Sequence, residues 1–317
     1  MKNRWIASLI LTMTIGGILA GCKSEKDKVG GTGEVLTQTL SQQEVQQVMA
    51  AGGQQKNEQN VLSFTEVVKG GMTVADEKLF DAAAVQTVDF TTADHMAGGR
   101  ALPIYCVDTK EKKVGLSFDA AWGNDDTEQI LEILKNHDIH VTFFMTGEWV
   151  ENYPEDVRAI LAAGHDLGNH SENHKNMSQL SDEEKQEEIM KVHTKVKELT
   201  GYDMFLFRPP YGDYDNEVIE TVKGCGYYPI QWDVDSLDWQ NKGLEDILRT
   251  VTEHKSLGNG SIILCHNGAE YTAQALNGLI NQLEEKGYEI VPVSELIYRD
   301  HYHINVQGRQ ISDRETL

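Results

Sequence analysis

The chain has 317 residues, with 50 acidic and 28 basic side chains and a formal net charge of −22. Such an excess of negative charge argues against binding nucleic acid through its phosphates, and against gripping an anionic polymer with a broad cationic surface. We therefore expect no nucleic-acid partner, and a neutral substrate fits the composition better.

The first 21 residues have the pattern of an export signal. A basic start precedes an apolar run that ends in the quartet LAGC at residues 19–22. The small residues before Cys22 resemble a bacterial lipobox, in which the cysteine is lipidated and becomes the new N-terminus. We expect a lipid anchor on the extracytoplasmic face of the cell membrane, with an uncleaved anchor or an ordinary secretory signal as the alternatives.

Two segments follow the signal. Residues 22–34 are charged, Gly-rich and nearly free of apolar side chains, which predicts a flexible tether. Residues 35–111 contain the Gln-rich amphipathic stretch LSQQEVQQVMAAGGQQ and several Gly-rich breaks. They predict a small accessory region with one or two helices, or a solvated spacer, and indicate no chemistry.

Cysteine usage indicates no disulfide framework. Besides Cys22 the chain has Cys106, Cys225 and Cys265, without a CxxC pair, so at most one bridge can form within the chain. Free, buried thiols that act as small apolar side chains are the interpretation that we favour.

From residue 112 onward, strand-like apolar runs alternate with amphipathic helical segments. The expected strands are VGLSF, IHVTFFM, MFLF, YYPIQWDVD, SIILCH and YEIVPV, with HDLGNH between two helices. The expected helices lie near residues 126–134, 154–164, 182–199, 216–223, 244–254 and 272–285. Seven or so βα units predict an α/β domain over residues 112–297 with a parallel sheet, most economically closed into a barrel. An open doubly wound sheet is the alternative, and residues 298–317 form a C-terminal extension.

Polar side chains follow the expected strands at the points where they end. They are Asp119, His170 with His174, Arg208, Asp235 with Asp238, and His266. Because the carboxyl ends of parallel strands meet at one rim of a barrel, we expect these groups to converge there. Capping or surface roles would need a separate explanation for each.

The histidines of NHSENH, His170 and His174, are four residues apart. On a helical turn this spacing sets both imidazoles on one face, within reach of one cation, although HxxxH alone is a weak signal. Ser171 stands where a zincin motif has its glutamate, so a general base must come from elsewhere in the fold, and Asp119 is the candidate.

Two further segments carry candidate groups. In FRPPYGDY, prolines restrict the backbone around Arg208 and Gly212 allows a sharp turn, so main-chain N–H groups can face a ligand. A structural turn with a surface arginine is the alternative. His266, after IILC, is a candidate general acid because Asp238 can orient and charge it.

In order and spacing these segments resemble the NodB-homology polysaccharide deacetylases, metal-dependent carbohydrate esterases with a distorted (β/α) barrel of about seven parallel strands. SFDAA stands where that family has TFDDG, and HSENH, RPPY, DSLDW and LCH match its later motifs in chain order. The resemblance spans residues 112–297 and leaves residues 23–111 outside it.

The resemblance implies proton-transfer roles for four residues. It makes Asp119 the general base that takes a proton from water, with Arg208 orienting it. It makes His266 the general acid that protonates the leaving amine, with Asp238 tuning its pKa.

The resemblance also implies how metal and substrate bind. His170 and His174 would bind one divalent metal ion, with Zn²⁺ or Co²⁺ expected. The backbone N–H of Tyr211 would stabilise the oxyanion, and Trp239 and Leu264 would enclose the acetyl methyl group.

One position departs from the family pattern. Ala120 stands where the family has a second aspartate, the third metal ligand. Asp125 or Asp126 could fold back to replace it, water could fill the position, or the metal could bind only with substrate. For both aspartates, capping of the next helix is the interpretation that we favour.

These features together predict a monomeric, lipid-anchored hydrolase that removes N-acetyl groups from an amino-sugar polymer such as peptidoglycan or chitin. An O-acetyl esterase acting on a xylan-type polysaccharide is the first alternative. A non-catalytic glycan-binding lipoprotein that lost its metal with Ala120 is the second.

Overall fold

The computed structural model describes residues 100–314. The expected signal, the lipidation site at Cys22, the tether and most of the accessory region lie outside these residues. Within residues 100–314, no helix has both the length and the apolar character that a membrane span requires.

A sheet of eight parallel strands positions the rest of the domain. Its strands run in the order β6-β5-β4-β3-β2-β8-β7, and β9 also pairs with β2. They are β2 (Lys113–Ala120), β3 (Thr142–Met145), β4 (Asp166–Asn169), β5 (Leu206–Phe207), β6 (Tyr228–Pro229), β7 (Val234–Asp235), β8 (Ile262–Asn267) and β9 (Glu289–Val291). Helices alternate with these strands, which confirms the predicted α/β class and the distorted (β/α) barrel.

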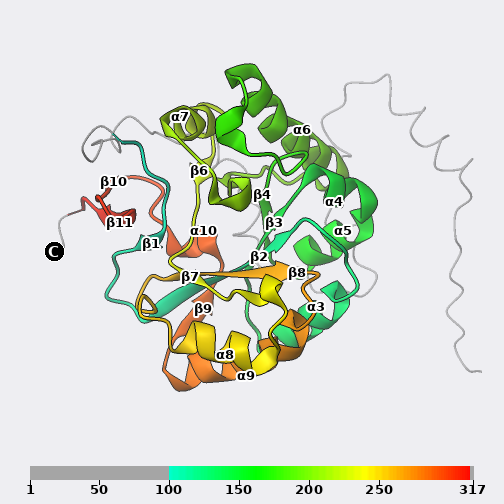
Figure 1. Cartoon of the computed structure of the whole chain (residues 1–317), viewed down its shortest axis with the longest axis vertical. Helices are drawn as coiled ribbons and strands as arrows, with labels where there is room; N and C mark the ends of the chain where they lie inside the picture. Colours follow the sequence, from blue (N-terminus) through cyan, green and yellow to red (C-terminus); the bar gives the residue numbers. More distant parts are fainter. Residues whose placement is uncertain (1–99, 315–317) are drawn as a thin grey trace, which may run out of the picture. The chain divides into compact units, whose positions relative to one another are not determined.

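Helices lie around the outside of the strands (Figure 1). They are α3 (Thr127–Asn136), α4 (Gly147–Asn152), α5 (Pro154–Ala162), α6 (Asp182–Thr200), α7 (Asn216–Gly224), α8 (Leu244–Thr252), α9 (Thr272–Glu285) and α10 (Val293–Leu296). The six long helices expected from the sequence are all present. The short helix α4 was not predicted, because six residues are too few to show a helical period. Its N-cap is Thr146, whose side chain accepts from the N–H of Trp149.

Local sequence sets the ends of α6, the longest of these helices. Ser181 accepts from the N–H of Glu184, and the Glu184 side chain accepts from the N–H of Ser181, which together form a capping box. Gly201 ends the helix in the left-handed conformation, with φ +79°. This helix matters for function because its buried face supports the loop that carries the two candidate metal-binding histidines.

The two faces of β2 have different surroundings. Leu116, Phe118 and Ala120 are fully buried in the main apolar cluster, which the surrounding helices share. Ser117 and Asp119 point to the opposite face, because side chains alternate along a strand. The register of β2 therefore separates the Ala120 side chain, in the apolar core, from the Asp119 side chain, at the end of the barrel interior.

Segments on both sides of the predicted domain pack together. β1 (Cys106–Val107) pairs with β11 (Arg309–Ser312), which pairs with β10 (Tyr302–Ile304). Ile104, fully buried, forms a bridge to Ile230 just after β6. The predicted boundary at residues 111/112 therefore falls after a segment that is already packed into the fold, because buried apolar contacts extend to Ile104.

The cysteines in the described part of the chain are free. Cys106 and Cys265 are buried and Cys225 is half-buried. Burial raises the pKa of each of these thiols. This agrees with the interpretation of these three residues as small apolar side chains rather than disulfide partners.

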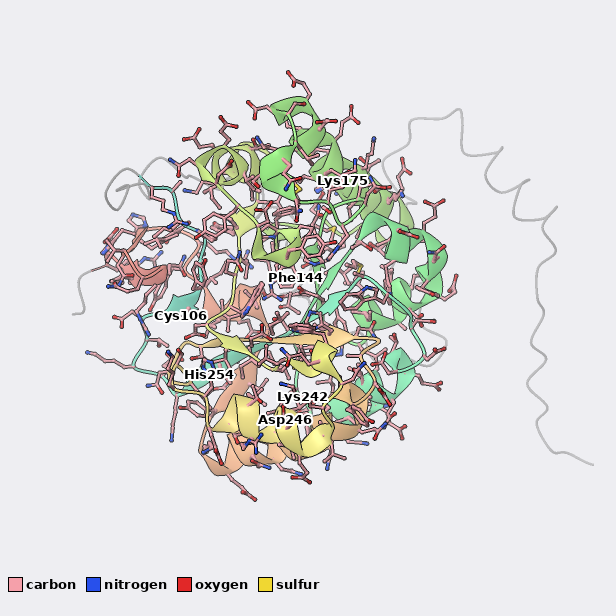
Figure 2. All side chains as sticks on the ribbon, in the orientation of Figure 1. Cys106, Phe144, Lys175, Lys242, Asp246 and His254 are labelled. Carbon is pink, nitrogen blue, oxygen red and sulfur yellow. The ribbon has the colours of Figure 1, made fainter. Side chains whose placement is uncertain are left out.

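Gly168→Ala should destabilise the domain by about 1–3 kcal/mol, because a side chain at this position has no room. A Cβ atom here would lie 2.4 Å from Cδ1 of Phe144, which lies among the strands at the centre of Figure 2. Gly224→Ala is the matched control, since nothing lies within 4 Å of the added atom. Urea denaturation measures both variants, and equal stability of the two would contradict the packing described here.

Candidate active site

The register of β2 against β8 places two proton-transfer candidates side by side. Asp119 and His266 are paired across these parallel strands. Paired residues on neighbouring strands are about 5 Å apart and point to the same face. Both side chains are largely buried, and both line a cavity of about 710 Å³.

Seven of the nine predicted catalytic, metal-binding and substrate-binding residues line this cavity. They are Asp119, His170, His174, Tyr211, Trp239, Leu264 and His266. The other two, Arg208 and Asp238, are buried behind Asp119 and His266. Asp235, at the end of β7, lines the cavity as well. The structure therefore brings together at one site the residues that the strand ends predicted.

Arg208 holds the Asp119 carboxylate. Its Nη1 donates to Oδ1 of Asp119 at 2.7 Å, and its Nη2 donates to Oγ of Ser117 at 2.9 Å. Burial alone would raise the pKa of Asp119, but the charge of Arg208 and the nearby histidines hold this pKa below its usual value. Asp119 is thus ionised at neutral pH, and its Oδ2 stays available to accept a proton. The alternative of a surface arginine is wrong, since Arg208 is fully buried.

His170 is held as a neutral ring with one nitrogen free. Its Nδ1 lies 2.7 Å from the carbonyl oxygen of Arg208, and a carbonyl only accepts, so Nδ1 carries the proton. Burial lowers the pKa of His170 to about 4, so Nε2 keeps its lone pair at neutral pH. Nε2 faces Oδ2 of Asp119 at 3.5 Å. Two acceptors that face each other in a buried site favour a cation or a proton donor between them.

The loop after β4 brings the second histidine to the first without a helical turn. His174 has φ +52° and Ser171 has φ +67°, so the predicted helical placement of the HxxxH pair is wrong. Side-chain contacts hold the loop instead: the N–H of His174 donates to Oγ of Ser171 at 3.0 Å, and Asn173 donates twice to the Glu188 carboxylate on α6. The rings of His170 and His174 still lie 4.9 Å apart, centroid to centroid.

Backbone strain concentrates at this rim. Among the described residues, seven that are not glycine have positive φ, and four of these line the cavity or directly follow a residue that does: Ser171, His174, Tyr211 and Asn241. Strained conformations of this kind persist only where the surroundings hold them, and they cluster at functional sites. The rim is therefore a constrained structure rather than a set of ordinary loops.

His266 has the opposite electrostatic setting from His170. Its Nδ1 donates to Oδ1 of Asp238 at 2.6 Å, and Oδ2 of Asp238 accepts from the His266 N–H and from Oγ1 of Thr272, each at 2.7 Å. Burial alone would lower the pKa of His266, but the bond to Asp238, with the charges of Asp119 and Asp235, raises this pKa above its usual value. A protonated His266 can therefore donate through Nε2 to a ligand in the cavity.

The turn formed by RPPY leaves a main-chain donor without a partner. Tyr211 has φ +59°, and within residues 100–314 its N–H makes no hydrogen bond. Across the cavity lie Trp239, which is 52% exposed, and Leu264, which is buried at 2%. This arrangement is compatible with the predicted oxyanion and methyl-binding roles, which stay predictions.

Neither nearby aspartate lines the cavity in place of Ala120. Asp126 stands at the N-cap position of α3, but its side chain makes no capping bond, so the favoured capping interpretation is wrong for this residue. Its carboxylate instead accepts from the N–H of Gly268 at 2.9 and 3.0 Å and from the Asn267 side chain. Asp125 is also outside the lining. Within residues 100–314, no group of three or more His, Cys, Asp or Glu side chains is arranged to hold a metal ion.

The sequence analysis missed several residues of the cavity wall. They are Ala121, Trp122, Trp232, Asn241, Gly268, Ala269 and Glu270. Trp122 carried a usable signal, since an aromatic residue lies directly after SFDAA. For the others, which come from loops after different strands, only the folded structure shows where they lie.

Comparison with known proteins identifies the family. Residues 107–230 match the family described as polysaccharide deacetylase. The chain is 35% identical over 200 residues to the peptidoglycan-N-acetylglucosamine deacetylase of Bacillus cereus, which spans 62% of this chain and 92% of that protein. The chain belongs to the polysaccharide deacetylase family. This confirms the family predicted from the five motifs.

Other similar proteins include one that is uncharacterized and one that is described as a pseudoenzyme. The uncharacterized protein YlxY of Bacillus subtilis is 34% identical over 203 residues, and the chain spans 63% of its length. The structure of BA3943 from Bacillus anthracis, described as a CE4 family pseudoenzyme, has a TM-score of 0.60 and 32% identity, covering 66% of this chain and 72% of that one. A mutant of BA3943 is described as having restored enzymatic activity.

Asp126→Ala should lower the stability of this deacetylase-family domain by about 1 kcal/mol, because it removes the acceptor of the Gly268 and Asn267 donors. Asp125→Ala is the neighbouring control and should stay within about 0.5 kcal/mol of the wild type. Denaturation midpoints and bound divalent metal are measured together. Loss of metal from Asp126→Ala at unchanged stability would show that Asp126 is a ligand, against the geometry described here.

Asp238→Asn should lower the pKa of His266, because burial remains while the charge of the hydrogen-bonded carboxylate is lost. In the wild type, a raised pKa means that His266 contributes stability at pH values below 6.5 and that this contribution is lost as pH rises through the folded pKa. In the variant this contribution of His266 to stability at low pH becomes smaller. NMR titration of the His266 ring measures the shift, and an unchanged midpoint would contradict the assigned role of Asp238.

Proposed function

We propose that this chain removes N-acetyl groups from amino sugars of peptidoglycan. The observation that carries the proposal is the pairing of Asp119 with His266 on adjacent strands, the first with its pKa lowered and the second with its pKa raised. Groups whose environments move their pKa values apart are typical of acid–base catalysis. Relatives named as peptidoglycan deacetylases support the choice of substrate.

The residues of the site are suited to a divalent metal ion. His170 is neutral, which is the ligating form of imidazole, and its bond to the Arg208 carbonyl fixes the ring as the second shell of a metal site does. His174 would be the second ligand, and Oδ2 of Asp119 lies on the same side. Imidazole ligands suit Zn²⁺ or Co²⁺. When bound, such an ion would act as a Lewis acid and make water a better nucleophile near neutral pH.

The chain's own residues then divide the reaction between them. Asp119 takes a proton at Oδ2 from the attacking water, while Arg208 holds its other oxygen. The N–H of Tyr211 donates to the oxygen that becomes negative, and Trp239 and Leu264 hold the methyl group. Nε2 of His266 donates its proton to the nitrogen as the C–N bond breaks, which leaves acetate and a free amine.

We also propose that the enzyme acts as a monomer on the outer face of the membrane, anchored through a lipid at Cys22. The sequence around this cysteine supports the anchor. Mass spectrometry of the membrane fraction would test it, since an unmodified Cys22 would rule the anchor out.

A specific observation favours a second function, that of a non-catalytic glycan-binding protein. Ala120 stands at the sequence position where the family pattern has its third metal ligand, and solved structures of similar fold include one described as a pseudoenzyme. Under this alternative the wild type would bind an amino-sugar polymer and release no acetate.

Asp119→Asn and His266→Ala should each reduce acetate release at least 100-fold, because each removes a proton-transfer group. The double variant should lose much less than the product of the two effects, since both groups serve one reaction. Acetate is measured with the full chain, supplied with Zn²⁺ or Co²⁺, on peptidoglycan, chitin oligomers and acetylated xylan. Binding without acetate release by the wild type would favour the glycan-binding alternative, and release from xylan alone would favour an O-acetyl esterase.

A further inference from the structure

Exposed aromatic side chains gather at the mouth of the cavity. The exposed large apolar residues in the described part of the chain are Trp122, Met190, Tyr211, Trp239 and Val306. The three aromatic residues among them all line the cavity. Tyr211 and Trp239 have roles in the mechanism proposed above, whereas Trp122 has none.

Trp122 lies beside both His266 and His174. Its ring centroid is 5.3 Å from that of His266 and 6.3 Å from that of His174, and the side chain is 51% exposed. A ligand that reaches the acid nitrogen of His266 therefore passes along the indole. No other exposed aromatic ring among the described residues contacts both histidines.

The loop that carries Trp122 is held on several sides. The carbonyl of Gly123 accepts from Nε1 of Trp149 at 3.2 Å, and Nδ2 of Asn124 donates to Asp156 at 2.6 Å. Asp126 binds the main chain at Gly268, as described above. The indole is thus exposed on a fixed support, and the protein keeps its large apolar face in water at a cost in free energy.

A fixed, flat and apolar ring matches the chemistry of a sugar ring. A pyranose is uncharged and presents C–H groups on its faces, while its hydroxyl groups project from the edges. An indole face can cover such a C–H face without taking hydrogen bonds from the hydroxyls. Rigid aromatic side chains provide this contact area with little loss of conformational entropy.

We propose that Trp122 is a binding platform that stacks on the pyranose ring carrying the reacting acetamido group. The proposal rests on the proposed function, because it takes that sugar to lie between His266 and His174. The contact is made equally before and during the reaction, so Trp122 contributes to binding rather than to the chemical step.

The test uses the full chain with Trp122→Ala, Trp122→Leu and Trp122→Phe, and Met190→Ala on α6 as an exposed control away from the cavity. Binding of the pentamer of N-acetylglucosamine is measured by calorimetry on protein kept free of metal with EDTA, and acetate is followed in the same samples, so that any turnover is seen. We expect about tenfold weaker binding for Ala and Leu, and little loss for Phe, which keeps an aromatic face. In protein supplied with metal, KM should rise by a similar factor, with kcat and the alkaline limb of its pH profile unchanged.

The possible results test the Trp122 proposal separately from the proposed deacetylase activity. Weaker binding in Trp122→Ala supports the platform even when the wild type releases no acetate, in which case only the deacetylase proposal fails. Unchanged binding and KM in Trp122→Ala overturn the platform even when the wild type is active. A fall in kcat with a displaced alkaline limb would also overturn it, since Trp122 would then act through His266. Absence of pentamer binding by the parent protein would overturn it as well.

Discussion

The buried ion pair between Arg208 and Asp119 is the interaction on which the site depends. The guanidinium is fully buried and lies between two aromatic rings, with Cζ 4.1 Å from the centroid of Phe144 and 5.5 Å from that of Trp232. Its second nitrogen donates to Ser117 and to the carbonyl oxygen of Gln231. Removing either partner of such a pair leaves an uncompensated charge in the interior, which is strongly destabilising.

The same arginine connects Asp119 to His170. Its main-chain carbonyl orients His170, while its side chain holds Asp119, so one residue at the end of β5 sets the geometry of two. The packing around it has little freedom, because Phe144 lies against Gly168 on the neighbouring strand. The absence of a side chain at Gly168 on β4 therefore affects the position of the Asp119 carboxylate, two strands away, through Phe144 and Arg208.

The acid side is built from a separate network. Asp238 binds the ring and the main chain of His266 and also receives the hydroxyl of Thr272 at the start of α9. The two networks move the pKa values of the paired residues in opposite directions, with that of Asp119 lowered and that of His266 raised. The Ala120 side chain lies on the far face of the same strand, in the apolar core, so this departure from the family pattern leaves both networks in place.

Much of this protein could be predicted from its sequence, because the features concerned are local. Amphipathic periods showed the six long helices, and polar residues at the ends of apolar runs indicated the rim of the barrel. The five motifs placed Asp119, Arg208 and His266 in one site, since parallel strands bring their carboxyl ends together.

The tertiary structure decided the features that depend on contacts between distant residues. Asp126 binds Gly268, 142 positions away, and no local pattern distinguishes this contact from helix capping. The four-residue spacing of His170 and His174 predicted a helical turn that is not there. Contacts with Glu188 and Ser171 hold their loop, in which Ser171 and His174 have positive φ, a conformation that local preference disfavours. The position of Trp122 over the site likewise follows from a loop fixed by Trp149 and Asp156, which lie on other elements of the chain. A sequence read locally shows which residues end each strand, but the energy that orients the loops beyond them comes from partners that only folding brings near.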